Sequence, residues 1–170
     1  MHSGIPGRLI FSLTLCVLIV SILIMKHQQI YTNCLAFQLT QARKKVFAWY
    51  ANYLKPLGLT PSYVYVLGVL RDKEYASPSE ISHLLELERP TVTTLLSRME
   101  RNGWINRVLN PNNRRETLVS LTDAGKEACD KAYPLLIEAD KTLNTVLNGE
   151  FAQLKERVET LNRILQEAAK

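Results

Sequence analysis

Apolar residues recur at helical spacing along most of the chain after residue 30. Between Tyr31 and Leu54 they alternate at steps of four and three, which is typical of the seam between paired helices. Further helices are predicted from Thr60 to Leu70, from Ser77 to Leu85, from Pro90 to Asn102 and from Thr122 through Leu143. A last helix, from Phe151 to Leu165, repeats the seam spacing after a break at Asn148-Gly149. The chain is therefore predicted to be mainly helical.

Several of these helices have clear start signals. Thr60-Pro61 places a hydroxyl at the cap position and proline in the first turn, where no N–H is needed. Ser77-Pro78-Ser79-Glu80 is a complete capping box for the helix that begins there. Thr122 is the predicted cap of the helix that runs from Thr122 through Leu143. Arg71–Glu74 is predicted to be a charged connector. The first helix after it should turn three residues toward the core: Ile81, Leu84 and Leu85.

Two short apolar runs follow the helix that ends near Gly103. Trp104–Leu109 and Glu116–Leu121 are predicted strands, and Asn110-Pro111-Asn112-Asn113 is the turn between them. Two short helices followed by a two-stranded ribbon form the layout of a winged helix-turn-helix, which places its second helix in the DNA major groove. The predicted fold class is mainly α with a small β-wing, flanked by N- and C-terminal dimerisation helices.

The helix from Pro90 to Asn102 separates into an apolar and a polar face. At about 100° per residue, one side carries Val92, Leu95, Leu96 and Met99. The opposite side carries Pro90, Thr93, Thr94, Ser97, Arg98 and Arg101. Short hydroxyls and arginines can contact base edges and phosphates, although a solvated polar face has the same composition.

Charge distinguishes these two readings. The span from Arg89 to Arg115 holds six arginines and one acidic residue, Glu100, while the net charge of the whole chain is +5. The net charge of all other segments together is therefore zero. A positive charge confined to the proposed reading surface is typical of phosphate binding.

The N-terminal region, residues 1–30, has a different character. Leu9–Met25 carries no charge, and Arg8 and Lys26 flank it. Seventeen such residues are just long enough for a membrane span. Met25-Lys26-His27 also looks like an ordinary N-terminus, so a mis-assigned start is the alternative. The protein is expected to be cytoplasmic, or membrane-anchored if this segment is a genuine span.

The order of four motifs carries a family resemblance. These are Leu57-Gly58-Leu59-Thr60, Pro90-Thr91-Val92-Thr93, Met99-Glu100-Arg101-Asn102-Gly103 and Leu121-Thr122-Asp123-Ala124-Gly125. From about Cys34 to Lys170 the chain resembles the MarR family of bacterial transcriptional regulators. The resemblance implies a domain over 31–170, with a winged helix-turn-helix at about 60–122 and dimerisation helices at 31–55 and 123–170.

The resemblance also implies a function. It predicts a homodimer that binds a pseudo-palindromic operator in double-stranded DNA, usually as a repressor, and that is released by a small aromatic or anionic effector. In the family the wing tip reads Asp-x-Arg; here Asn113 occupies the acidic position and Arg115 matches the arginine. Arg89 stands where a small polar cap is usual. The predicted DNA-binding residues are Arg89, Pro90, Thr91, Thr93, Thr94, Ser97, Arg98, Arg101, Arg107, Asn113, Arg114 and Arg115.

Other predicted sites rest on helical position. The seam helices suggest a dimer interface made of Leu35, Leu39, Phe151, Leu154, Val158, Leu161 and Leu165. The family's ligand pocket suggests four tyrosines: Tyr50, Tyr53, Tyr63 and Tyr65. Oxidant-sensing members carry a cysteine near the start of the first helix, which makes Cys34 a redox candidate, although their position falls nearer Ala36.

Competing classes find less support. The sequence contains no nucleophile elbow, phosphate-binding glycine loop or paired-carboxylate pattern, so an enzyme is not predicted. Three widely spaced cysteines and three isolated histidines do not suggest a metal site, and no cofactor is expected. Two alternatives stay open: a thiol-oxidation sensor that uses Cys34, and a membrane-tethered regulator or interaction protein that uses residues 9–25.

Overall fold

The computed structural model describes residues 32–110 and 113–168. The apolar segment Leu9–Met25 lies outside these residues, so its role stays a prediction. Within the two described ranges, no helix combines the length and the apolar character needed to cross a bilayer.

The first described helix is α2, Leu35–Leu54. The chain divides into two compact units, residues 1–46 and 47–170, and the division falls within α2. A short 3₁₀ turn, η1 (Lys55–Leu57), follows and ends at Gly58, whose φ of 66° is readily adopted by glycine.

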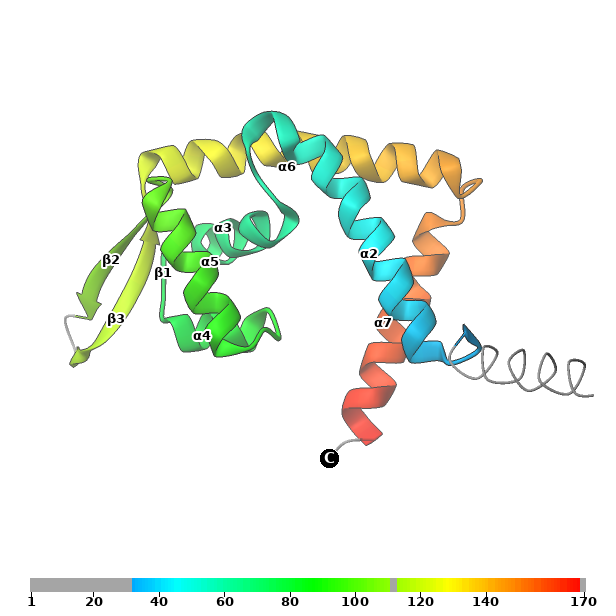
Figure 1. Cartoon of the computed structure of the whole chain (residues 1–170), viewed down its shortest axis with the longest axis horizontal. Helices are drawn as coiled ribbons and strands as arrows, with labels where there is room; N and C mark the ends of the chain where they lie inside the picture. Colours follow the sequence, from blue (N-terminus) through cyan, green and yellow to red (C-terminus); the bar gives the residue numbers. More distant parts are fainter. Residues whose placement is uncertain (1–31, 111–112, 169–170) are drawn as a thin grey trace, which may run out of the picture. The chain divides into compact units, whose positions relative to one another are not determined.

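The second unit contains all the remaining elements. In order they are α3 (Pro61–Lys73), β1 (Tyr75–Ala76), α4 (Pro78–Leu84), α5 (Arg89–Arg101), β2 (Ile105–Asn110), β3 (Asn113–Leu121), α6 (Asp123–Val146) and α7 (Phe151–Ala168). The three strands form an antiparallel sheet in the order β1-β3-β2. Figure 1 shows the β2–β3 hairpin beside α5. This mainly helical fold with a small wing confirms the predicted fold class.

The predicted helix starts are also confirmed. The side chains of Thr60 and Thr122 accept hydrogen bonds from the backbone N–H groups of Tyr63 and Gly125. At α4 both halves of the capping box are present: Ser77 N donates to Glu80 Oε2 at 2.7 Å, and Glu80 N donates to Ser77 Oγ at 3.2 Å.

One core holds the second unit together. Its fully buried side chains come from the end of α2, from α3, α4, α5 and α6, and from the sheet, and they include Leu54, Val66, Leu67, Leu70, Ile81, Val92, Leu96, Met99, Ile105, Val119 and Ala132. Helix α3 contributes Val66, Leu67 and Leu70 to this core and is therefore a central, largely buried helix of the unit. The core fixes α5 against β2 and thereby positions the proposed reading surface.

Four details of the local prediction were wrong. Residues Arg71–Lys73 continue α3 instead of forming a connector. Leu84 is 48% exposed, because Ile81 and Leu85, one turn apart, are the residues that face the core. The second wing strand begins at Asn113, three residues early, because it pairs with Asn110 across a tighter turn. Strand β1 was not predicted, since two residues are too few to show alternation.

Candidate nucleic-acid interface

Helix α5 presents a continuous polar face. Val92, Leu96 and Met99 are fully buried and Leu95 is half-buried, so the opposite side must face solvent. The exposed residues there are Arg89, Pro90, Thr91, Thr93, Thr94, Ser97, Arg98 and Arg101. The helix begins at Arg89, and Glu88 is its N-cap without a side-chain cap bond. The assignment of Arg89 to the cap position was therefore wrong by one residue.

Two threonines on this face are already hydrogen-bonded within the helix. Thr93 Oγ1 donates to the carbonyl oxygen of Arg89, and Thr94 Oγ1 donates to that of Pro90, both at 2.9 Å. Each hydroxyl has one proton, so toward an outside partner these oxygens act as acceptors. The exposed adenine N6 and cytosine N4 amino groups are the matching donors in a major groove, and each threonine methyl can contact a thymine methyl.

The wing lies next to this helix. Strands β2 and β3 pair in register from Ile105 with Leu121 to Leu109 with Thr117, and the register shifts between Leu109 and Asn110. Asn113 is the first residue of β3, and Arg114 and Arg115 follow it in the same strand. The structure thus places all three predicted wing residues on one strand at the tip of the hairpin. The side chains of Arg114 and Arg115 are outside the described set.

One ion pair connects the helix to the wing. Arg107 Nε on β2 donates to Glu100 Oε2 on α5 at 2.9 Å, and the two side chains are 31% and 44% exposed. The prediction counted Arg107 among the DNA-binding residues and Glu100 only as a charge of opposite sign. The two residues lie seven positions apart on different elements, so no helical or strand spacing signals the contact in the sequence.

Three of the four predicted pocket tyrosines contact different partners. Tyr50 Oη donates to Asp140 Oδ1, and burial together with this bond raises the pKa of Tyr50 well above its usual value. Tyr53 packs on Trp49 with ring centroids 5.9 Å apart, and Tyr63 packs edge-on against Trp104 at 5.4 Å. Tyr65 is 49% exposed. Their grouping as one pocket stays a prediction.

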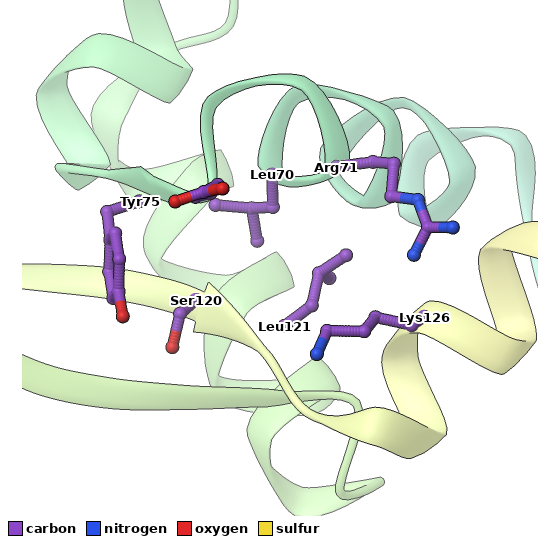
Figure 2. A pocket seen from close by; sticks show the side chains of 7 residues that line it. Leu70, Arg71, Tyr75, Ser120, Leu121 and Lys126 are labelled. Carbon is purple, nitrogen blue, oxygen red and sulfur yellow. The ribbon is translucent and has the colours of Figure 1, made fainter.

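A cavity of about 380 Å³ lies elsewhere, between the end of α3, β1, the end of β3 and the start of α6 (Figure 2). It is lined by Leu70, Arg71, Glu74, Tyr75, Ser120, Leu121 and Lys126, and thus by none of the predicted tyrosines. Both positively charged side chains that line the cavity form ion pairs with carboxylates of α6: Arg71 with Asp130 at 3.0 Å and Lys126 with Asp123 at 3.2 Å.

The two described cysteines differ in environment. Cys34 is exposed just before α2. Cys129 is half-buried on α6, and burial raises the pKa of its thiol, which makes it less nucleophilic at neutral pH. Among the described residues no group of three or more histidines, cysteines or carboxylates is arranged to hold a metal ion.

The predicted dimer residues lie on two helices, α2 and α7. On α2, Leu35 and Leu39 are 56% and 41% exposed. On α7, Leu154, Val158 and Leu165 are 47%, 41% and 57% exposed, and Phe151 and Leu161 are half-buried. Helix α7 has no fully buried residue. Each helix therefore carries an apolar stripe in contact with solvent in the single chain.

Two short helices, the second with a polar, arginine-bearing face, and a β2–β3 hairpin that forms the wing define a winged helix-turn-helix protein. Residues 59–117 match the model of the MarR family. The uncharacterized HTH-type transcriptional regulator YwoH of Bacillus subtilis is 30% identical over 109 residues, which cover 64% of this chain and 79% of YwoH. The chain belongs to the MarR family.

Two further comparisons extend this relationship. The multiple antibiotic resistance protein MarR of Escherichia coli is 33% identical over 85 residues, covering 50% of this chain and 59% of that protein, which is less than two thirds of its length. The transcriptional repressor CouR, solved bound to a 23-mer DNA duplex, superimposes with a TM-score of 0.66 at 25% identity, covering 82% of this chain and 94% of CouR.

Proposed function

We propose that this protein is a sequence-specific, double-stranded-DNA-binding transcriptional regulator that acts as a homodimeric repressor. The observation that carries the proposal is the polar face of α5, which lies beside an arginine-bearing wing and is held there by a buried apolar face. The positive balance of the span from Arg89 to Arg115 supports phosphate binding. The DNA duplex bound to CouR supports the same class of partner.

The residues divide by role. Arg98, Arg101 and Arg107 contact phosphates and set the register, because guanidinium groups bind phosphate oxygens without regard to sequence. Thr93, Thr94 and Ser97 face the base edges of the major groove. Arg115 enters the minor groove, where a narrow A·T-rich tract has the deepest negative potential. Arg89, Pro90, Thr91, Asn113 and Arg114 flank these contacts.

Dimerisation follows from the apolar stripes on α2 and α7. A pseudo-palindromic operator requires two recognition helices about 34–36 Å apart, one helical turn of DNA, and a two-fold dimer supplies that spacing. Release by a small aromatic or anionic effector is proposed from the family resemblance, with Tyr50, Tyr53, Tyr63 and Tyr65 as its candidate contacts. We place the working protein in the cytoplasm.

The test is a salt titration of duplex binding by the full chain. Fluorescence anisotropy with a labelled duplex from upstream of the protein's own gene should give a dissociation constant that rises steeply with salt, with a log–log slope of about 0.9 per phosphate contacted. A scrambled duplex of equal length is the control. Binding that is independent of salt, or equal for both duplexes, would contradict sequence-specific DNA binding.

A further inference from the structure

Glu100 occupies an unexpected place for an acidic residue. It is the one carboxylate between Arg89 and Arg115, and it lies on α5, the helix that faces DNA in the proposed function. A negative charge near phosphates weakens binding by repulsion. Its 44% exposed side chain is not needed to fill the core. Its presence therefore needs a reason other than packing.

The contact with Arg107 supplies that reason. The backbone turns back sharply after α5: Gly103 adopts a φ of 73°, its N–H donates to the carbonyl of Glu100 at 2.9 Å, and the N–H of Trp104 donates to that of Met99 at 3.0 Å. This turn brings β2 beside the end of α5, so that Arg107 reaches Glu100. The ion pair thus connects the two elements that the proposed function places on DNA.

The geometry leaves most of the guanidinium available. The bond to Glu100 uses Nε of Arg107 and one carboxylate oxygen. Among the residues whose side chains the structure describes, the two terminal nitrogens of Arg107 have no further hydrogen-bond or ion-pair partner. A guanidinium has five N–H donors in a planar fork, so one edge can bind a carboxylate while the other end points to a phosphate.

We infer that Glu100 is a positioning residue that holds the Arg107 guanidinium ready for a DNA phosphate and ties the wing to the recognition helix. This inference rests on the proposed function. A free arginine loses side-chain rotational freedom when it binds, at a cost of order 0.5–1.5 kcal/mol per immobilised side chain. An arginine already held by Glu100 has lost part of that freedom before DNA arrives.

The inference makes a prediction opposite in sign to simple electrostatics. If Glu100 acted only through its charge, its removal would strengthen DNA binding. If it positions Arg107, Glu100→Ala should weaken binding by about twofold to tenfold, the range that corresponds to immobilising one long side chain. Glu100→Gln keeps an oxygen that accepts from Nε while removing the charge. It should therefore bind at least as tightly as the unaltered chain.

The experiment measures duplex affinity against salt for the full chain and four variants. They are Glu100→Ala, Glu100→Gln, Arg107→Ala and the double variant Glu100→Ala with Arg107→Ala. The double variant should bind no more weakly than Arg107→Ala alone, because Glu100 acts through Arg107. Arg107→Ala should lower the salt slope by about one phosphate contact. Exposed ion pairs contribute little to folding, so the variants should remain folded, which circular dichroism checks.

Glu88→Ala is the matched control. Glu88 is the exposed N-cap of the same helix and makes no side-chain cap bond, so its removal reports the effect of charge alone and should strengthen binding. If Glu100→Ala strengthens binding as Glu88→Ala does, the positioning role is wrong while the proposed function stands. If the unaltered chain shows no salt-dependent duplex binding, the proposed function and this inference fail together.

Discussion

A single residue, Gly125, decides how closely the start of α6 can approach the turn between α5 and β2. A Cβ built at Gly125 would overlap the backbone carbonyl oxygen of Trp104 and would lie 3.3 Å from Leu121 Cδ2. The same carbonyl accepts from Thr122 N at 3.1 Å, and Thr122 Oγ1 donates to Gly103 O at 2.6 Å. The start of α6 is thus docked on the turn that leads into β2, and only glycine fits there.

Gly125→Ala should therefore destabilise the protein by about 1–3 kcal/mol, since the obstructing atom is backbone and cannot rotate away. Gly68→Ala is the matched control: it lies within α3, and a Cβ there meets nothing within 4 Å. That change should stabilise by about 0.5–1 kcal/mol through helix propensity. Urea unfolding of both variants makes the comparison. Equal effects would contradict the proposed close approach at Gly125.

At the scale of elements, α4 depends on its first turn. It is only seven residues long, too short to be stable by propensity alone, and it is anchored by the capping box and by buried Ile81. The hydrogen bond from the Ser77 backbone N–H lowers the pKa of the Glu80 carboxyl, and the interaction with the Ser77 side chain lowers it further. The cap stabilises α4, which packs against α5, so loss of the cap should also disturb the proposed DNA-binding face of α5.

Ser77→Ala should lower the free energy of unfolding by about 0.5–2 kcal/mol, the usual cost of a lost N-cap. The capping carboxylate also predicts a pH dependence. Because folding lowers the pKa of Glu80, its contribution is present above the unfolded value, about 4.3, and is lost as pH falls through the folded value.

That contribution should be no more than about 0.5 kcal/mol, since the Glu80 side chain is 52% exposed to water. Urea midpoints at pH 7 and pH 3.5 measure it, with Glu80→Gln as the control that lacks the titrating group. The same acid sensitivity in both proteins would assign it to other carboxylates.

At the scale of the whole molecule, α7 leaves several large apolar side chains exposed to solvent in the single chain. Leu154, Val158 and Leu165 fall on one stripe and are each more than 40% exposed. Burying such a stripe against a second copy would contribute roughly 25 cal/mol per Å² of apolar surface removed from water. The net positive charge falls in the span from Arg89 to Arg115, which contributes no residue to the proposed seam.

Leu154→Glu combined with Val158→Glu should convert a dimer into a monomer, because like charges would meet across a two-fold seam. Light scattering coupled to size exclusion measures the mass. Glu156→Ala, on the opposite side of α7, is the control and should leave the mass unchanged. The monomeric variant should also lose affinity for a palindromic duplex while keeping its helical content. A dimer that survives both substitutions would place the interface elsewhere.

Local signals in the sequence were enough to predict most elements. Caps at Thr60, Ser77 and Thr122 depend on neighbours within three residues, and the apolar face of α5 depends on a period of 3.6, so both can be read along the chain. The same reasoning found the exposed threonines and arginines of α5. It could not find β1, because a two-residue strand exists only through its pairing with Ser120 and Val119.

Contacts between distant residues were decided by tertiary packing. The Glu100–Arg107 pair, the bond from Tyr50 to Asp140, the contact of Tyr63 with Trp104 and the docking of Gly125 on Trp104 each join different parts of the chain. No periodic pattern encodes such contacts, because the turn at Gly103 and the shared core bring those backbones together. The chain's own residue order therefore determines the winged fold and its positive face, whereas packing in three dimensions determines which of those charges are held in place and which residue holds them.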